Sequence, residues 1–336
     1  MNVADNVLTG VIPTEIAVLT TMISIFLSRN QLEGIIPTEI GQLASLQVFH
    51  VSSNLLTGAI PDLFADLPAL TSFEASLNFL SGTLPPSLFE VASLESVDVS
   101  VNGLTGRIPA LDQLAAIKRI DLNTNSLSGT FPENITALAT LQALNLTING
   151  LTGTIPTVIG NMVNLLDLSI SDNFLSATIP TEMGLMVALR NLIIERNFLT
   201  GAIPTELAGM TSLVTFRLSG NGLGPDLPVE LASLPKLREL DCTGCMIATL
   251  PTEFVNDAPS LQVLKLGNNF LTPPGLPVEW TSESLETLDL SGNLFGIAFP
   301  ASDLAQLANL KNLLLASCGF SGTLPTDIVS FAALGE

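Results

Sequence analysis

Apolar residues recur along the chain at three fixed places ahead of an asparagine. In one such unit, Leu213, Phe216 and Leu218 stand eight, five and three positions before Asn221. The last two slots have the period of two that is typical of a β-strand, so both side chains point to the same face. The pattern therefore predicts a short strand whose inward side chains join a hydrophobic core.

This unit returns along almost the whole chain, which predicts a solenoid. The asparagine recurs every 24 residues with one step of 23, cysteine replaces it at 245 and 318, and the last step, from Asn293 to Cys318, is 25. A period in this range is typical of repeats that stack their strands in parallel, about 4.8 Å apart. We expect about 14 repeats in a single domain over residues 1–336. The repeats are marked by Asn6, Asn30, Asn54, Asn78, Asn102, Asn125, Asn149, Asn173, Asn197, Asn221, Cys245, Asn269, Asn293 and Cys318.

The asparagine turns the chain off the sheet, and its amide can pair with backbone groups that the turn buries. A second signature, Leu-Thr-Gly-x-Ile-Pro-Thr-Glu, follows it, as at Leu199 to Glu206. Glycine permits a tight backbone, and proline stops a helix from running through. The Thr-Glu pair predicts the start of a short helix, with the threonine as its cap and the glutamate in its first turn.

The combined string N-x-L-T/S-G-x-I/L-P in units of 24 residues resembles the plant-type extracellular leucine-rich repeat of receptor ectodomains and polygalacturonase-inhibiting proteins. This resemblance implies an α/β repeat solenoid. It would be a curved right-handed superhelix with a concave parallel β-sheet, a short extra sheet beside it, and short helices or turns on the convex side. It also implies recognition of proteins, peptides or small ligands on the concave and flanking faces. The paired cysteines and tryptophan of the family's N-terminal cap are missing, and the units between residues 221 and 280 are irregular, with Pro277 one place late.

Neither end of the chain carries a polar cap of the kind that solenoids need. We therefore expect a piece of a longer array, or ends that another molecule covers, including end-to-end or edge association of copies. Neither a secretory signal nor a membrane-spanning segment is visible, because the most apolar stretch, 16–27, is short and interrupted by polar residues. An extracellular or cell-surface location is the expectation that follows from the resemblance.

The composition disfavours several classes of function. The net charge of −20, from 31 acids against 11 bases, argues against binding to nucleic acid. One histidine and three cysteines do not supply a catalytic or metal site, so we expect no enzyme activity, no cofactor and no metal. Cys242 and Cys245 occupy a leucine slot and the asparagine slot, and the spacing places Cys318 too far from Cys245 for a disulfide.

Candidate ligand-binding residues come from the outward slot four positions before each asparagine. Along this slot Phe26 and His50 form an aromatic end, and Glu74, Asp98 and Asp121 form a row of acids. Like charges on neighbouring strands destabilise a sheet, so the row indicates a cationic partner. The alternative is that Lys118 and Arg119 neutralise part of it. A calcium site is less favoured, because sheet side chains diverge.

A second candidate cluster is rich in arginine and includes Arg196 and Arg217 on the eighth and ninth strands. Arginine offers paired donors for carboxylates or glycans. The alternative interpretation is a solvated lattice of weak ion pairs. Two glycosylation sequons, at Asn134 and Asn145, add a little support for an extracellular protein. Asn134 is predicted on a convex helix, and Asn145 on a concave strand.

We therefore predict a non-catalytic recognition module that binds a protein or peptide ligand on its concave face. A different class of function is ice binding, through serine and threonine hydroxyls that recur one unit apart on the sheet and just before the glycine. A third is a purely architectural role in a wall or matrix. The hydroxyls just before the glycine are those of Thr9, Thr57, Ser81, Thr105, Ser128, Thr152, Ser176 and Thr200.

Overall fold

The computed structural model describes residues 1–272, 280–299, 304, 306–307 and 309–323. The chain forms two compact units. Unit 1 comprises Met1–Gly153 and Asp167–Phe174, and unit 2 comprises Thr154–Leu166 and Leu175–Glu336. Within each unit, every coil of chain adds one strand to a parallel main sheet, so the predicted repeat solenoid is confirmed. The single domain expected over residues 1–336 stays a prediction, and Pro277 lies outside the described residues.

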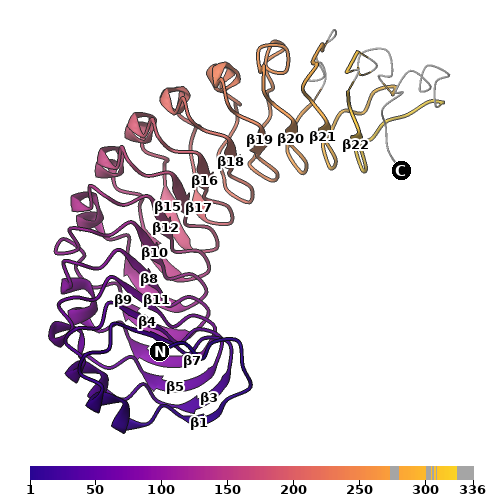
Figure 1. Cartoon of the computed structure of the whole chain (residues 1–336). Coiled ribbons are helices and arrows are strands. Elements are labelled where there is room, and N and C mark those ends of the chain that lie inside the picture. The colour runs from indigo at the N-terminus through magenta and orange to yellow at the C-terminus, as the bar shows by residue number, and fades with distance from the viewer. Residues whose placement is uncertain (273–279, 300–303, 305, 308, 324–336) are drawn as a thin grey trace. The chain divides into compact units, whose positions relative to one another are not determined.

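Three-residue strands build the main sheet, and they follow chain order within each unit (Figure 1). Leu144 lies opposite Leu168, so partners on neighbouring strands stand one repeat apart, as the sequence predicted. In unit 1 the strands are β2 (Ser24–Phe26), β4 (Val48–His50), β6 (Ser72–Glu74), β8 (Ser96–Asp98), β10 (Arg119–Asp121), β12 (Ala143–Asn145) and β14 (Asp167–Ser169). In unit 2 they are β16 (Asn191–Ile193), β18 (Thr215–Arg217), β19 (Glu239–Asp241), β20 (Val263–Lys265), β21 (Thr287–Asp289) and β22 (Asn312–Leu314).

A second parallel sheet, the side sheet, follows the asparagine turns, as the resemblance implied. Its register differs from that of the main sheet. Gly58 pairs with Leu80, whereas the residue one full repeat after Gly58 is Gly82, so each strand is shifted by two residues relative to its neighbour. In unit 1 its strands are β1 (Thr9–Val11), β3 (Gln31–Gly34), β5 (Leu55–Ala59), β7 (Phe79–Thr83), β9 (Gly103–Arg107), β11 (Ser126–Thr130) and β13 (Gly150–Gly153). Farther along the chain lie β15 (Phe174–Ala177) and β17 (Phe198–Leu199).

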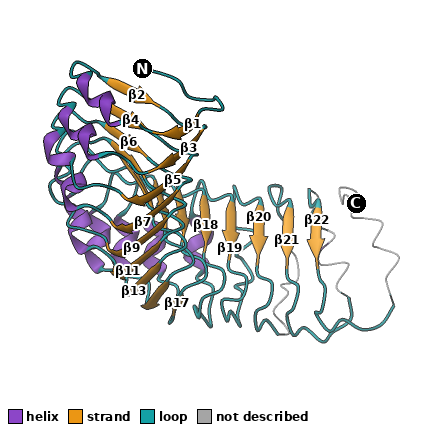
Figure 2. Cartoon of the chain, turned by 90° about the horizontal axis from the view of Figure 1, so that it is seen from below, coloured by secondary structure: helices purple, strands orange, loops and turns teal. Residues whose placement is uncertain are grey.

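Short 3-10 helices close most of the described coils up to β19 on the side away from the main sheet (Figure 2), whereas the coil between β9 and β10 is closed by turns alone. The predicted capping role of threonine is wrong. Pro13 is the N-cap of η1, and Thr14 is the first helical residue, whose hydroxyl donates to Glu15 instead. Glu15 does lie in the first turn, as predicted. Unit 1 contains η1 (Thr14–Val18), η2 (Thr38–Gln42), η3 (Phe64–Asp66), η4 (Pro86–Glu90) and η5 (Glu133–Ala137), and unit 2 contains η6 (Thr157–Asn161), η7 (Thr181–Leu185), η8 (Thr205–Gly209) and η9 (Val229–Ser233).

The asparagines form a buried ladder that ties successive coils together. The Asn173 amide nitrogen donates to the carbonyl oxygens of Leu146, Ile170 and Ser171 at 3.0, 3.2 and 3.0 Å. Its Oδ1 accepts from the Leu151 amide at 3.0 Å. One side chain thus closes its own turn and binds the preceding coil at two points, which confirms the predicted structural role of this slot.

Where cysteine replaces the asparagine, the thiol keeps one of these bonds. Cys245 Sγ donates to the Leu218 carbonyl at 3.3 Å, and Cys318 Sγ donates to the Leu290 carbonyl at 3.2 Å. Both thiols are free and buried, as is Cys242, so the prediction of core thiols without a disulfide between them is confirmed. The pKa of the Cys242 thiol is raised, mainly by a hydrogen bond with Cys245 and secondly by burial. The thiol is therefore an unreactive core group.

Replacement of Asn173 by alanine should lower the free energy of unfolding by about 2–5 kcal/mol, because several buried backbone groups lose their partner. Asn173→Cys should cost less than Asn173→Ala, since a thiol can still donate one bond. Equilibrium urea unfolding measures both changes, with the exposed Asn161→Ala on η6 as the matched control. Equal losses for N173A and N161A would refute the proposed role of the ladder.

Candidate functional site

The first and third residues of each main-sheet strand point away from the core and form what we call the open face. Its third-position column in unit 1 has the predicted order, because the strand register places Phe26 opposite His50, His50 opposite Glu74, and Glu74 opposite Asp98. Asp98 in turn lies opposite Asp121. The five residues predicted for this half of the face therefore lie side by side on adjacent strands.

The aromatic end of the column is a small polar cluster around His50. The rings of Phe26 and His50 meet edge to face with centroids 5.2 Å apart. His50 Nδ1 lies 3.5 Å from Glu74 Oε2, and Nε2 lies 2.8 Å from Ser72 Oγ. Burial lowers the pKa of His50 below its ordinary value of 6.5, and the neighbouring Glu74 carboxylate only partly offsets this effect.

The row of acids has a structural role that the sequence analysis missed. Asp98 Oδ1 accepts from the Ser100 backbone amide at 3.0 Å and from its hydroxyl at 2.7 Å. Asp289 and Ser291 repeat this arrangement at 2.9 and 2.6 Å. An aspartate at the strand end therefore closes the turn that follows, in the manner of an Asx turn. The spacing Asp-x-Ser could have signalled this role.

Asp121 is buried and held from several sides. Its Oδ2 lies 3.1 Å from Arg119 Nη2, and its Oδ1 accepts from Asn123 Nδ2 at 2.6 Å. Lys118, the other predicted neutraliser, pairs with Glu95 at 2.8 Å instead. The alternative that local cations compensate the acids therefore holds for Asp121 through Arg119, and not through Lys118.

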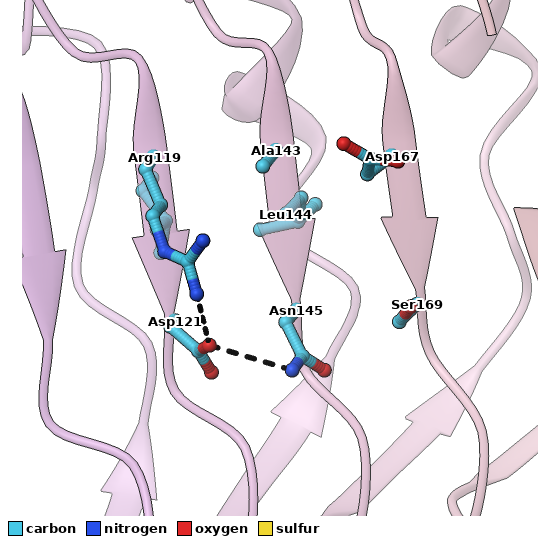
Figure 3. Close-up of a pocket in the computed structure, with 8 residues that line it drawn as sticks. Arg119, Asp121, Ala143, Leu144, Asn145, Asp167 and Ser169 are labelled. Atoms are coloured by element: carbon cyan, nitrogen blue, oxygen red, sulfur yellow. Dashed lines mark hydrogen bonds and ion pairs between the residues drawn. The ribbon is translucent and has the colours of Figure 1, made fainter. Parts of the chain in front are cut away.

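A hollow of about 170 Å³ opens on this part of the open face. Ala143 lies between Arg119 and Asp167 in the first-position column, so a short side chain is flanked by two longer ones. Figure 3 shows Arg119 reaching toward Asp121, with Asn145 on the other side of the same carboxylate. The sequence analysis did not foresee this hollow, although the single alanine between two charged residues was its signal. It is lined by Arg119, Ile120, Asp121, Ala143, Leu144, Asn145, Asp167 and Ser169.

In unit 2, Arg217 lies on the open face as predicted and forms a two-pronged ion pair. Its Nε and Nη2 lie 3.0 Å from the two oxygens of Glu239. The hydrogen bond to Glu239 raises the pKa of Arg217. Lys265 adds contacts with Glu239 and Asp241 at 3.8 and 3.5 Å. These acidic and basic side chains therefore neutralise one another within the protein, as in the alternative interpretation of weak ion pairs.

Arg196 does not lie on a strand. It follows β16 in the turn just before the asparagine, with a φ of 48°. The prediction that placed it on the eighth strand is therefore wrong, because the strand ends at Ile193 and the left-handed turn begins before Asn197.

The two sequons lie on opposite sides of their coils, as predicted. Asn134 lies on η5, and its amide is 3.5 Å from Asp112 Oδ1. Asn145 ends β12 and lines the hollow, where its Oδ1 accepts from the Thr147 amide at 3.2 Å. Glycosylation of either asparagine stays a prediction.

Two searches of the described residues bear on other kinds of site. No group of three or more His, Cys, Asp or Glu side chains in this part of the chain could hold a metal ion. None of the helices in the same residues is long and apolar enough to cross a membrane.

Comparisons with known proteins agree with this architecture. The family model described as Leucine Rich Repeat matches residues 21–43 and 45–67. The chain is similar to the crystal structure of a TDR receptor, with 29% identity, a TM-score of 0.89, and coverage of 99% of this chain and 58% of that one. It is also similar to the plant peptide hormone receptor RGFR1 in complex with RGF2, at 25% identity and a TM-score of 0.71, with 99% and 73% coverage.

A plant ice-binding protein is a third structural relative, at 29% identity and a TM-score of 0.60, with coverage of 68% of this chain and 74% of that one. The comparison with curated proteins gave no match. The chain thus spans little more than half the length of the TDR receptor that it resembles.

Acidification should destabilise the protein as the pH falls through about 6.5, because the lowered pKa of His50 means that the unfolded chain binds the proton more readily. The contribution of neutral His50 to the free energy of unfolding is fully present above about pH 6.5 and is lost as the pH falls through the lowered pKa of the folded state. Unfolding curves at pH 7.5 and 6.0 for the protein and its His50→Gln variant test this expectation. His50 is the sole histidine, so an equal loss of stability in both proteins would contradict it.

Proposed function

Because this chain is a leucine-rich-repeat protein whose structure is similar to that of plant receptors, we propose that its open face binds a protein or peptide ligand. The observation that carries this proposal is the polar hollow above Ala143, between Arg119 and Asp167, on the surface of paired strands. Its charged and amide groups are held by a rigid parallel backbone, which reduces the entropy lost when a ligand binds.

The binding residues that we propose are those of the third-position column together with the lining of the hollow. Phe26 and His50 offer apolar and aromatic surface, while Glu74 and Asp98 offer half-buried carboxylates. Arg217 lies on the corresponding face of unit 2, and Arg196 lies in the turn beside that face. Long repeated surfaces of this kind bind extended partners by many modest contacts.

The same proposal includes a non-catalytic, extracellular or cell-surface role. Leucine-rich-repeat arrays are typically non-catalytic, and the plant relative RGFR1 is a peptide hormone receptor. A glycan on Asn134 would project from η5 and leave the open face accessible, whereas one on Asn145 would obstruct the hollow. We therefore propose Asn134 as the glycosylated position of the two.

Filling the hollow should weaken ligand binding while the fold remains intact. We expect Ala143→Arg to weaken by at least tenfold the binding of ligands selected on the immobilised protein from a library of secreted peptides. Thr287→Arg, at the same register position of β21 in unit 2, adds the same charge and bulk elsewhere and should leave binding unchanged. Equal affinities of A143R and the unmodified protein, measured by surface plasmon resonance, would refute the site.

Ice binding is a second candidate, and the side sheet is the surface that favours it. Its two-residue slide places Thr105 opposite both Thr83 and Ser126, so hydroxyls lie in oblique rows on exposed strands. The Thr105 and Thr152 hydroxyls donate to the carbonyls of Gly82 and Gly129 at 3.1 and 3.2 Å, which orients their lone pairs regularly.

The other hydroxyl column predicted for ice binding, on the main sheet, is less exposed than the side sheet. Ser76, Ser100 and Ser171 are buried, and Ser76 Oγ donates to Ser52 Oγ at 3.0 Å. The side sheet, whose hydroxyls are exposed, is therefore the surface that we propose for ice binding.

If the side sheet binds ice, the purified protein should show thermal hysteresis. Ice crystals that grow in its presence should also develop facets. Thr105→Lys should remove both effects, because a long cation interrupts the hydroxyl rows, whereas Thr20→Lys on an exposed turn should preserve them. A protein without measurable hysteresis would leave ligand binding as the sole candidate of the two.

A further inference from the structure

One backbone position in each repeat is left-handed. The residue before the asparagine has a φ between 48 and 57° wherever it is not glycine. This conformation suits glycine, asparagine and aspartate, and it is unfavourable for bulky or β-branched residues. The other repeats place glycine or a polar residue there, and the polar set includes the β-branched Thr124 and two arginines: Asp5, Arg29, Ser53, Thr124, Asp172, Arg196, Gly220, Gly244, Asn268, Gly292 and Ser317.

Three repeats of unit 1 place an aliphatic side chain at this slot. Leu77, Val101 and Ile148 take φ values of 54, 53 and 52°. They are also 52%, 37% and 50% exposed, so the fold buries their apolar side chains only in part. We call these three residues the apolar ridge; Leu77 and Val101 lie on adjacent coils, and Thr124 separates Val101 from Ile148. All three combine backbone strain with partly exposed apolar surface.

The hydrogen-bond ladder between coils explains how the strain persists. The Leu77 amide donates to the Ser100 carbonyl at 3.0 Å, and the Leu77 carbonyl accepts from the Asn54 amide at 3.2 Å. Val101 and Ile148 are held in the same way by their neighbouring coils. A strained backbone conformation persists where several surrounding contacts fix it, and such positions are often functional.

An acidic column runs beside the ridge and indicates what covers it. Glu74 precedes Leu77 by three residues, and Asp98 precedes Val101 by three. Glu74 and Asp98 lie directly opposite one another. Glu74 Oε2 lies 3.5 Å from His50 Nδ1, but burial lowers the pKa of this imidazole, so it is a polar neighbour of Glu74 and not a counter-charge at neutral pH. Asp98 forms no ion pair among the described residues.

We propose that the apolar ridge and the Glu74–Asp98 pair together bind a peptide segment that carries both cationic and apolar side chains. The cationic group lies against the two carboxylates, and the apolar side chains pack on Leu77 and Val101, with a further apolar contact at Ile148 beyond Thr124. This inference rests on the proposed ligand-binding function and specifies the chemical class of the ligand.

The test uses variants that alter the ridge without altering charge. Leu77→Asn, Val101→Asn and Ile148→Asn combined introduce the residue that this chain itself places at the same slot in Asn268. The control variant is Val18→Asn, an exposed apolar residue on η1. Three labelled synthetic decapeptides serve as probes in 0.15 M salt. The first combines lysine and leucine, the second lysine and serine, and the third glutamate and leucine, and binding is measured by fluorescence anisotropy.

The unmodified protein and V18N should bind the lysine–leucine peptide at least about fivefold more tightly than the lysine–serine peptide. The triple variant should lose this preference yet melt about 2 °C or more higher, since strain is relieved. An unchanged preference in the triple variant would overturn the proposal, as would preferential binding of the glutamate–leucine peptide. If A143R abolishes binding of the selected ligands and the triple variant does not, the proposed function stands and the ridge is refuted.

Discussion

The fold depends on one buried interaction, the amide bridge that the repeat asparagine makes between successive coils. Asn173 donates to Leu146 of the preceding coil and to Ile170 of its own, and accepts from Leu151. A single side chain therefore sets the spacing of two coils and the position at which each chain leaves the main sheet. Because a buried unpaired amide or carbonyl is costly, this geometry is repeated rather than varied. Even the cysteine at 245 retains one of these bonds through its thiol.

This constraint separates the residues that the fold needs from those that it tolerates. Inward slots are apolar and buried in nearly every described repeat, whereas the third strand position ranges from Phe26 to Arg217. The separation is incomplete, however. Asp98 and Asp289 occupy outward slots, yet each closes the turn after its strand. A charged residue on the open face therefore indicates a ligand only where its contacts within the fold leave it charged and accessible.

The elements that could be predicted from sequence are those set by contacts within one repeat or at the repeat period. The inward leucines, the asparagine turn and the main-sheet register all follow from the spacing of 24 residues. The side-sheet register could not be predicted, because it depends on how far each strand slides, and Gly58 opposite Leu80 departs from the period by two residues. The 3-10 turns that begin after proline, as at Pro13, depend on backbone geometry that helix propensities do not describe.

The hollow and the ridge were missed for a related reason. Each is a property of neighbouring repeats, since Ala143 is unremarkable until Arg119 and Asp167 stand on either side of it. Val101 likewise resembles any exposed valine until its φ of 53° is known. Local rules and the global fold usually agree in natural proteins, and exceptions concentrate where function is selected. In this solenoid the hydrogen-bond ladder fixes the backbone so firmly that a side chain can oppose its preferred conformation. The residues that do so are therefore more informative about a partner than those that merely fit.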